Sequence, residues 1–192
     1  MGSLIHRCLA LLAILGGAVA QAADRAEALS LTCNGCHGPD GVSFGEHIPS
    51  IAGQNAEYLF RVLQEFRDGE REATIMGRVA RGYPVYDLRK IAGYFAAREW
   101  RYIPPPPLPG DAARGADLHG ERCAECHEDS GRYSDKDVPR IAGQREHYLF
   151  RQLVSYARQV PGLPQPTKMA EALDGLSMAD LAALSHYYRQ VQ

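Results

Sequence analysis

Two stretches of this chain share one spacing of cysteine and histidine: Cys33-Asn34-Gly35-Cys36-His37 and Cys123-Ala124-Glu125-Cys126-His127. The pattern Cys-x-x-Cys-His is the covalent attachment site of a c-type haem. Two thiols at this spacing can each add to one vinyl group of the porphyrin, and the histidine that follows is held under the iron as an axial ligand. We therefore expect two haem c groups, bound covalently through Cys33, Cys36, Cys123 and Cys126 and ligated by His37 and His127. Two haems in one small chain indicate electron transfer.

The length and the charge narrow the possible classes of protein. The chain has 192 residues and a formal charge of −2 at pH 7. That length suits two small domains, whose thin cores a covalently attached haem would enlarge. The slightly acidic balance argues against nucleic acid and against an anionic membrane surface as partners.

The first 22 residues predict a secretory signal peptide. Arg7 supplies the charged start, residues 9–19 are apolar, and Ala20-Gln21-Ala22 is a cleavage pattern. The apolar run is shorter than the roughly 20 residues that a spanning helix needs. We therefore expect a periplasmic protein with no transmembrane anchor. Cys8 would leave with the signal, and the remaining four cysteines all belong to the two haem motifs.

An internal repeat relates the two halves of the chain. Ile51-Ala52-Gly53-Gln54 recurs at 141–144, and Tyr58-Leu59-Phe60-Arg61 recurs at 148–151, both at the 90-residue offset of the haem motifs. Between the halves, four consecutive prolines favour an extended, semi-rigid spacer. We predict a first domain over 23–102, a Pro-rich linker over 103–110 and a second domain over 111–192.

The spacing of apolar residues predicts an all-α fold. In each half we expect a helix that runs into the haem motif, a middle helix and a closing helix. These are expected over 25–36, 56–66 and 86–98 in the first half, and over 113–126, 146–156 and 177–189 in the second. Ser177 with Asp180 is a plausible start of the last helix.

The second axial ligand of a haem iron in an electron-transfer protein is usually methionine or histidine. Met76 lies eight residues before Pro84, and Met169 lies eight residues before Ser177. The repeat therefore pairs these two methionines, and we predict that Met76 and Met169 are the axial ligands. Met178 matches Val85 and is expected to be a helix or packing residue.

A haem with two histidine ligands is the competing possibility. Four further histidines follow the signal segment: His47, His119, His147 and His186. None of them has a histidine at the matching position of the other half, so we expect each to be structural or exposed.

Two prolines also pair in the repeat: Pro49 and Pro139 each lie two residues before Ile-Ala-Gly-Gln. A backbone carbonyl at this point could accept the Nδ1 proton of the axial histidine and fix its tautomer and orientation. A simple turn proline is the alternative.

The order of Cys-x-x-Cys-His, a proline-containing loop and a methionine before the last helix resembles class I cytochrome c domains. Gly115 and Tyr187 lie where that family crosses its first and last helices, whereas Arg25 replaces the glycine in the first half. The resemblance implies an all-α protein of two tandem class I cytochrome c domains, each wrapped around one covalent haem.

Two dihaem families share this arrangement over nearly the whole chain. Ile-Ala-Gly-Gln followed by Tyr-Leu is similar in both halves to cytochrome c4, a periplasmic electron shuttle. Residues 73–83 and 91–95 resemble the first domain of the cytochrome subunit of flavocytochrome c sulfide dehydrogenase, and residues 167–170 are similar to its second ligand loop. Cytochrome c4 does not usually show the Thr-Ile-Met-Gly-Arg run at 74–78, which favours the flavocytochrome subunit.

The resemblance to the flavocytochrome subunit implies a heterodimer with an FAD-containing flavoprotein that oxidises sulfide. This chain would accept electrons one at a time and pass them to a small electron-acceptor protein or an oxidase. FAD would belong to the partner alone, and the chain would not be catalytic by itself. The alternative is a free-standing, cytochrome c4-like shuttle to a terminal oxidase.

Other interpretations of the cysteines fit less well. Structural zinc usually needs four nearby ligands, a thioredoxin-like motif needs a strand before its helix, and two disulfides would leave both histidines unexplained. A dihaem peroxidase would need one iron with an open site, and paired Met76 and Met169 argue against that.

Overall fold

The computed structural model describes residues 25–104 and 110–192, and these residues form helices and loops with no strand among them. The predicted signal peptide and residues 105–109 of the predicted linker lie outside the described residues. Within the described ranges, no helix combines the length and the apolar character that crossing a membrane requires.

The first half begins with helical residues 25–37. The next elements are the 3-10 turn η1 (Pro39–Gly41) and the helices α2 (Ala56–Asp68), α3 (Met76–Arg81) and α4 (Val85–Ala96). Helix α2 packs against both α3 and α4. Buried residues of α4, among them Ile91 and Phe95, contact Cys33 and its neighbours in the first helix.

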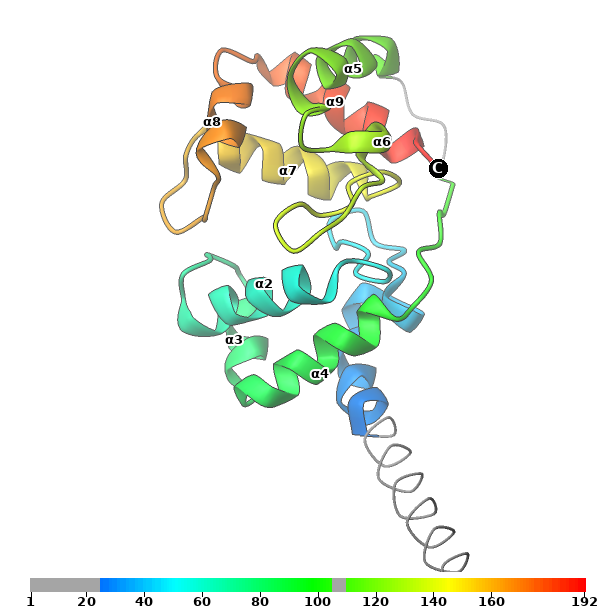
Figure 1. Cartoon of the computed structure of the whole chain (residues 1–192), viewed down its shortest axis with the longest axis vertical. Helices are drawn as coiled ribbons and strands as arrows, with labels where there is room; N and C mark the ends of the chain where they lie inside the picture. The colour runs from blue at the N-terminus through cyan, green and yellow to red at the C-terminus, as the bar shows by residue number, and fades with distance from the viewer. Residues whose placement is uncertain (1–24, 105–109) are drawn as a thin grey trace, which may run out of the picture.

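The second half repeats this plan with additional turns. Its elements are α5 (Ala112–Leu118), the π-helical turn η2 (His119–Cys123), α6 (Glu128–Gly131), α7 (Glu146–Ala157), α8 (Thr167–Leu173) and α9 (Met178–Gln190). Helix α9 packs against α5 and α7, and the core between them contains Leu118, Leu149, Leu184 and Tyr188. Figure 1 shows the two groups of helices one above the other, with α2 and α7 on the sides that face each other.

Local signals set several helix ends. The side chain of Asn55 accepts hydrogen bonds from two backbone N–H groups at the start of α2, and Gly69 ends that helix with φ of 82°. Ser177 and Asp180 form a reciprocal capping box at the start of α9, which confirms the predicted start. Such caps satisfy backbone groups that have no partner inside the helix.

The predicted crossing of the first and last helices of the second half is confirmed. A Cβ atom on Gly115 would lie 2.2 Å from the Ala183 carbonyl oxygen and 2.6 Å from Cβ of Tyr187, so only glycine lets the two helices approach this closely. In the first half, Arg25 stands at this position instead. It donates a hydrogen bond to the hydroxyl of Tyr86 and lies 3.5 Å from the carboxylate of Asp87, so polar contacts join these two helices.

The helix predicted over 113–126 differs from the structure in its second part. The α-helix ends at Leu118 and widens into the π-turn η2, which the Ala124 N–H closes by donating to the His119 carbonyl at 2.9 Å. The wider turn accompanies burial of the His119 ring, whose Nδ1 lies 2.9 Å from the Tyr188 hydroxyl. This contact joins residues 69 positions apart, so local periodicity does not reveal it.

Candidate haem sites

The four predicted thiols are free in the structure and differ in exposure. Cys33 and Cys123 are half-buried, whereas Cys36 and Cys126 are exposed. Burial raises the pKa of the Cys33 and Cys123 thiols. In each motif, one thiol therefore points toward the protein interior and the other toward the surface, on a short helical or turn segment.

His37 is buried and held by the backbone of the proline loop. Its Nδ1 lies 2.9 Å from the Pro49 carbonyl oxygen, which leaves Nε2 as the nitrogen available to an iron. Burial lowers the pKa of His37, and the Pro49 carbonyl opposes this shift. The imidazole is thus neutral at pH 7, which is the form that binds metals. This geometry confirms the hydrogen bond expected at Pro49.

His127 is placed in the same way but is held differently. Burial, followed by the nearby His119, lowers its pKa to about 4, and the Pro139 carbonyl acts in the opposite direction. However, Nδ1 of His127 is buried and makes no hydrogen bond within normal geometric limits among the described residues. The Pro139 carbonyl therefore lies near the ring but outside normal hydrogen-bond geometry. The expected second copy of the Pro49 bond is absent between these described residues.

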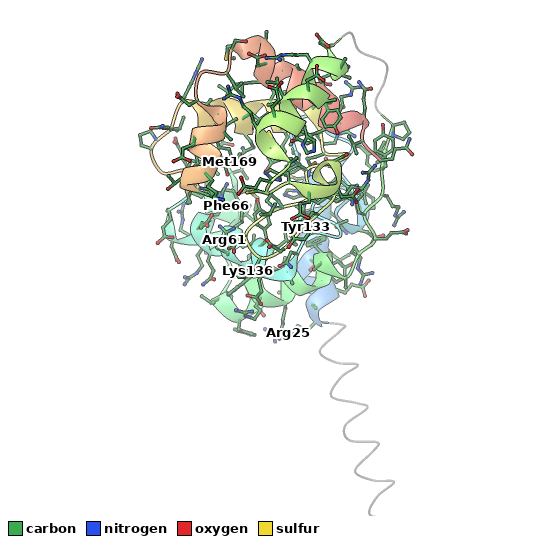
Figure 2. All side chains as sticks on the ribbon, turned by 45° about the horizontal axis from the view of Figure 1, so that its top comes forward. Arg25, Arg61, Phe66, Tyr133, Lys136 and Met169 are labelled. Carbon is green, nitrogen blue, oxygen red and sulfur yellow. The ribbon has the colours of Figure 1, made fainter. Side chains whose placement is uncertain are left out.

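The two predicted methionine ligands lie in matching short helices. Met76 is the first residue of α3 and Met169 lies in α8; both are half-buried. Figure 2 shows Met169 on α8. Met178, at the start of α9, is 48% exposed and lines a surface hollow with residues of α7, as expected for a residue outside the ligand set.

In the second half, the methionine segment is tied to the haem motif. Helix α8 packs against η2, which ends at Cys123. Lys168 pairs with Glu125 inside the motif, and Arg122 donates a hydrogen bond to the Asp174 carbonyl at 2.9 Å. These contacts bring Met169 and the Cys-x-x-Cys-His segment of the same half together.

The first half has a corresponding tie. The hydroxyl of Thr32, next to Cys33, lies 2.7 Å from the hydroxyl of Tyr83, which follows α3. Helix α3, which begins with Met76, also packs on α2. The two segments that carry the predicted ligands therefore meet in each half.

The four other histidines have protein contacts. The rings of His47 and His147 stack across the boundary between the halves, with centroids 5.0 Å apart. His186 is buried, with Nδ1 3.3 Å from Glu146, and His119 is bonded to Tyr188 as described above. His47 and His147 are exposed, whereas His119 and His186 are buried, which agrees with the expectation that each of the four is structural or exposed.

Trp100 and Arg140 form a feature that sequence reasoning missed. The Arg140 guanidinium lies 5.0 Å from the centre of the Trp100 ring. Trp100 Nε1 and Arg140 Nε are buried and have no hydrogen-bond partner among the described residues. Buried donors usually have acceptors, and a haem propionate would be a suitable one. The thiols, the neutral imidazoles and these donors together fit a covalently attached haem. The sequence could have pointed to this feature, because Trp100 is the single tryptophan of the chain.

Comparisons with known proteins give relatives over most of the chain, while no family model matches. A cytochrome c4 from Pseudomonas aeruginosa is 30% identical over 84% of this chain and 84% of the relative. A thiosulfate dehydrogenase electron acceptor from Stutzerimonas stutzeri is 39% identical over 93% of this chain and 91% of the relative. The cytochrome subunit of sulfide dehydrogenase from Chlorobaculum tepidum is 49% identical over 72 residues, which are 38% of this chain and 64% of that relative.

Solved structures share the fold. Reduced cytochrome c4 from Pseudomonas stutzeri superposes with a TM-score of 0.78 at 26% identity, covering 88% of this chain and 98% of that one. Thiosulfate dehydrogenase TsdBA from Marichromatium purpuratum gives a TM-score of 0.79 at 25% identity, covering 88% of this chain and 40% of that one. With its two haem motifs and its all-α repeat, the chain belongs to the cytochrome c4 family of dihaem electron-transfer proteins and carries two haem c groups.

Proposed function

We propose that this chain is the electron-accepting cytochrome of a periplasmic sulfide dehydrogenase, where an FAD-containing flavoprotein subunit donates the electrons. The 49% identity to the cytochrome subunit of sulfide dehydrogenase supports this donor. The chain passes the electrons on to a small acceptor protein or an oxidase. Export by the signal peptide over 1–22 and the two domains over 23–102 and 111–192 are part of the proposal.

The ligand set is part of the same proposal. His37 and Met76 ligate the iron of the first haem, and His127 and Met169 ligate that of the second. When bound, each haem supplies a one-electron ferric–ferrous couple. The residues of the chain attach each haem, present a neutral imidazole and hold the methionine segment against the haem motif.

The observation that carries the choice of a protein partner is a set of four exposed apolar side chains in and beside α3 and α4, which we take as the docking surface. Ile75 is 59% exposed, Val79 38%, Val85 39% and Tyr86 53%, and Ile75 directly precedes Met76. Apolar side chains gathered on a surface mark interaction sites. A donor that docks here would contact the segment that carries the proposed ligand of the first haem.

A thiosulfate dehydrogenase is the second candidate donor, because the relative described as its electron acceptor matches 93% of this chain at 39% identity. Both candidates place the chain beside a sulfur-oxidising enzyme. They differ in the donor's cofactor and in the substrate that reduces the haems.

The test is a pull-down of the haem-loaded protein from its native periplasm, with flavin absorbance measured in the eluate and with sulfide or thiosulfate added. A co-purifying flavoprotein that reduces the haems with sulfide supports the proposal. Reduction by thiosulfate without flavin supports the second candidate, and a cytochrome that elutes alone supports a free shuttle.

A pair of variants tests the docking surface. Val79→Lys puts a charge on the apolar surface and should weaken capture of the flavoprotein. Met178→Lys is the matched control, since it charges an exposed apolar residue of the second half. Equal capture by both variants and the unchanged protein would contradict docking at α3.

A further inference from the structure

Two equivalent glutamines join the halves of the molecule. Gln54 and Gln144 end the repeated Ile-Ala-Gly-Gln, and both side chains are buried, at 5% and 3% exposure. Gln144 reaches into the first half, where its Oε1 accepts from the Ser50 N–H at 2.8 Å and its Nε2 donates to the Ser50 carbonyl at 2.9 Å. Gln54 binds Arg140 of the second half in the same way, at 2.9 Å and 2.7 Å.

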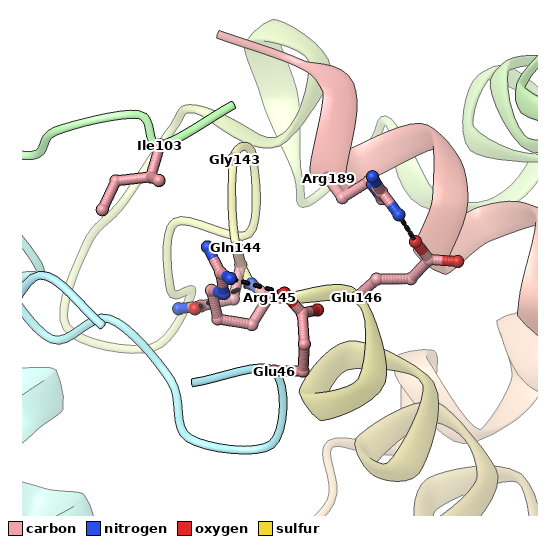
Figure 3. Close-up of a pocket in the computed structure, with 7 residues that line it drawn as sticks. All are labelled: Glu46, Ile103, Gly143, Gln144, Arg145, Glu146 and Arg189. Atoms are coloured by element: carbon pink, nitrogen blue, oxygen red, sulfur yellow. Dashed lines mark hydrogen bonds and ion pairs between the residues drawn. The ribbon is translucent and has the colours of Figure 1, made fainter. Parts of the chain in front are cut away.

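The orientation of the Gln144 amide is well determined. One end must accept and the other must donate, so only one assignment of its oxygen and nitrogen satisfies both bonds. The Arg145 N–H also donates to Oε1 at 3.0 Å, which fixes the oxygen from its own side. Figure 3 shows Gln144 beside Arg145, whose guanidinium pairs with Glu46 of the first half at 2.5 Å. The pocket between these residues has a volume of about 10 Å³, the space of one water at most, so this part of the boundary is closely packed.

The target of Gln144 is the peptide group that supports the axial histidine. Pro49 C=O and Ser50 N–H belong to one peptide unit. Its oxygen accepts from His37 Nδ1 at 2.9 Å, while its N–H donates to Gln144. Hydrogen bonds in a chain polarise one another. The bond to Gln144 therefore makes the Pro49 oxygen a stronger acceptor for the histidine proton.

From this connection we infer that Gln144, a residue of the second half, is a positioning residue that tunes the reduction potential of the first haem. A stronger bond at Nδ1 makes the imidazole a more basic ligand. A more basic ligand favours the ferric state, so Gln144 lowers the potential of the first haem. The inference rests on the ligation by His37 proposed above.

The corresponding glutamine of the first half, Gln54, makes equivalent contacts to the second half, but these contacts do not strengthen a hydrogen bond to the axial histidine there. Gln54 binds the Pro139–Arg140 peptide, but His127 Nδ1 has no hydrogen bond to that peptide within normal limits. Gln54 therefore contributes to the joint between the halves as Gln144 does, while its effect on the second haem is weaker. The repeat thus supplies a matched control inside the same molecule.

The experiment compares Gln144→Met with Gln54→Met in the haem-loaded protein. Methionine is similar in length and removes both hydrogen bonds. Potentials are measured by redox titration followed by NMR, with each haem identified by its axial methionine signals. We expect Gln144→Met to raise the potential of the first haem more than that of the second. We expect Gln54→Met to leave the first haem unchanged.

A second readout is the Nδ1 proton of His37 in the reduced, diamagnetic protein. Its resonance should move upfield in Gln144→Met because the hydrogen bond weakens, and should stay in place in Gln54→Met. An equal shift of the first-haem potential in both variants would overturn the inference, because loosening of the joint would then explain it. The absence of a shift in both variants would also overturn it, because Gln144 would then have no effect on the first haem.

Gln144→Leu covers the case in which the methionine variant fails to load haem. Leucine also removes both hydrogen bonds and adds no charge, so the first-haem potential should rise more than that of the second; an equal or opposite change would overturn the inference. The flavin pull-down and the ligand variants test the proposed function separately. The difference in first-haem potential between the Gln144 and Gln54 variants does not depend on which protein donates the electrons.

Discussion

Replacing Gly115 by alanine tests the close crossing of α5 and α9. The added Cβ would lie 2.2 Å from the Ala183 carbonyl oxygen, where contacts under 3.0 Å essentially do not occur. The helices must therefore separate by about 0.8 Å, since the obstacle is backbone that cannot rotate away.

The magnitude follows from the core beneath the crossing. Leu118 and Leu184 are fully buried at 1% and 0% exposure, and burial of each is worth about 1.5–3 kcal/mol. A gap of about 0.5–1 Å forfeits a quarter to a half of the dispersion attraction. Overpacked helices lose about 1–3 kcal/mol in general, and alanine regains about 1 kcal/mol of helix propensity. We expect Gly115→Ala to lower the free energy of unfolding by about 1 kcal/mol, which is the middle of the overpacking range less the gain in helix propensity.

The assay is urea unfolding of the haem-loaded protein, followed by far-ultraviolet circular dichroism and by Soret absorbance. Gly93→Ala is the control, because Gly93 lies in α4 with nothing within 4 Å of its added Cβ. That variant should be stabilised by up to about 1 kcal/mol. Equal stability of Gly115→Ala and the unchanged protein would refute the crossing as described.

The ligand assignment predicts that Met76→Ala and Met169→Ala each remove about half of the weak near-infrared band of methionine-ligated ferric haem, because each ligates one of two irons. Met178→Ala should leave the band intact; loss of half the band in that variant would show that the pairing by repeat is wrong. Ser177→Ala should lower the free energy of unfolding by about 1 kcal/mol, because it removes the cap of α9; an unchanged urea midpoint would contradict this. Hydrogen bonds from Ser177, followed by Arg114, lower the pKa of Asp180 below its ordinary 3.8. The carboxylate's contribution should therefore be complete above that ordinary value and be lost as pH falls through the lower, folded-state value; Asp180→Asn should abolish this part of the pH dependence of unfolding.

Much of the site is predictable because it is local. Five adjacent residues predict each haem attachment, and the spacing of apolar residues predicts α2, α7 and α9 to within two residues at each end. The equivalence of Met76 and Met169 follows from counting along a duplicated chain. The bond from His37 to Pro49 spans 12 residues within one repeat unit, and the motif order was enough to predict it.

The second half shows where such reasoning fails. The same motif order predicts a bond between His127 and Pro139, yet His127 Nδ1 has no bonded partner among the described residues. The π-turn that replaces the end of the predicted helix moves His119 onto Tyr188. Both departures depend on how side chains far apart in sequence fill one core, and hydrophobic spacing contains no such information.

By itself, the sequence determined the number of haems, the duplication and the helical class, and it predicts the attachment residues, since each depends on spacing along the chain. Only the tertiary structure decided how the halves meet. Gln144 and Ser50 lie 94 residues apart, and Gln54 and Arg140 lie 86 apart. The repeat marks both glutamines as equivalent, but it does not say whether they bind within a half or across the boundary. Docking of the two halves places each amide against the other half's proline loop, because there it can satisfy both groups of a buried backbone residue.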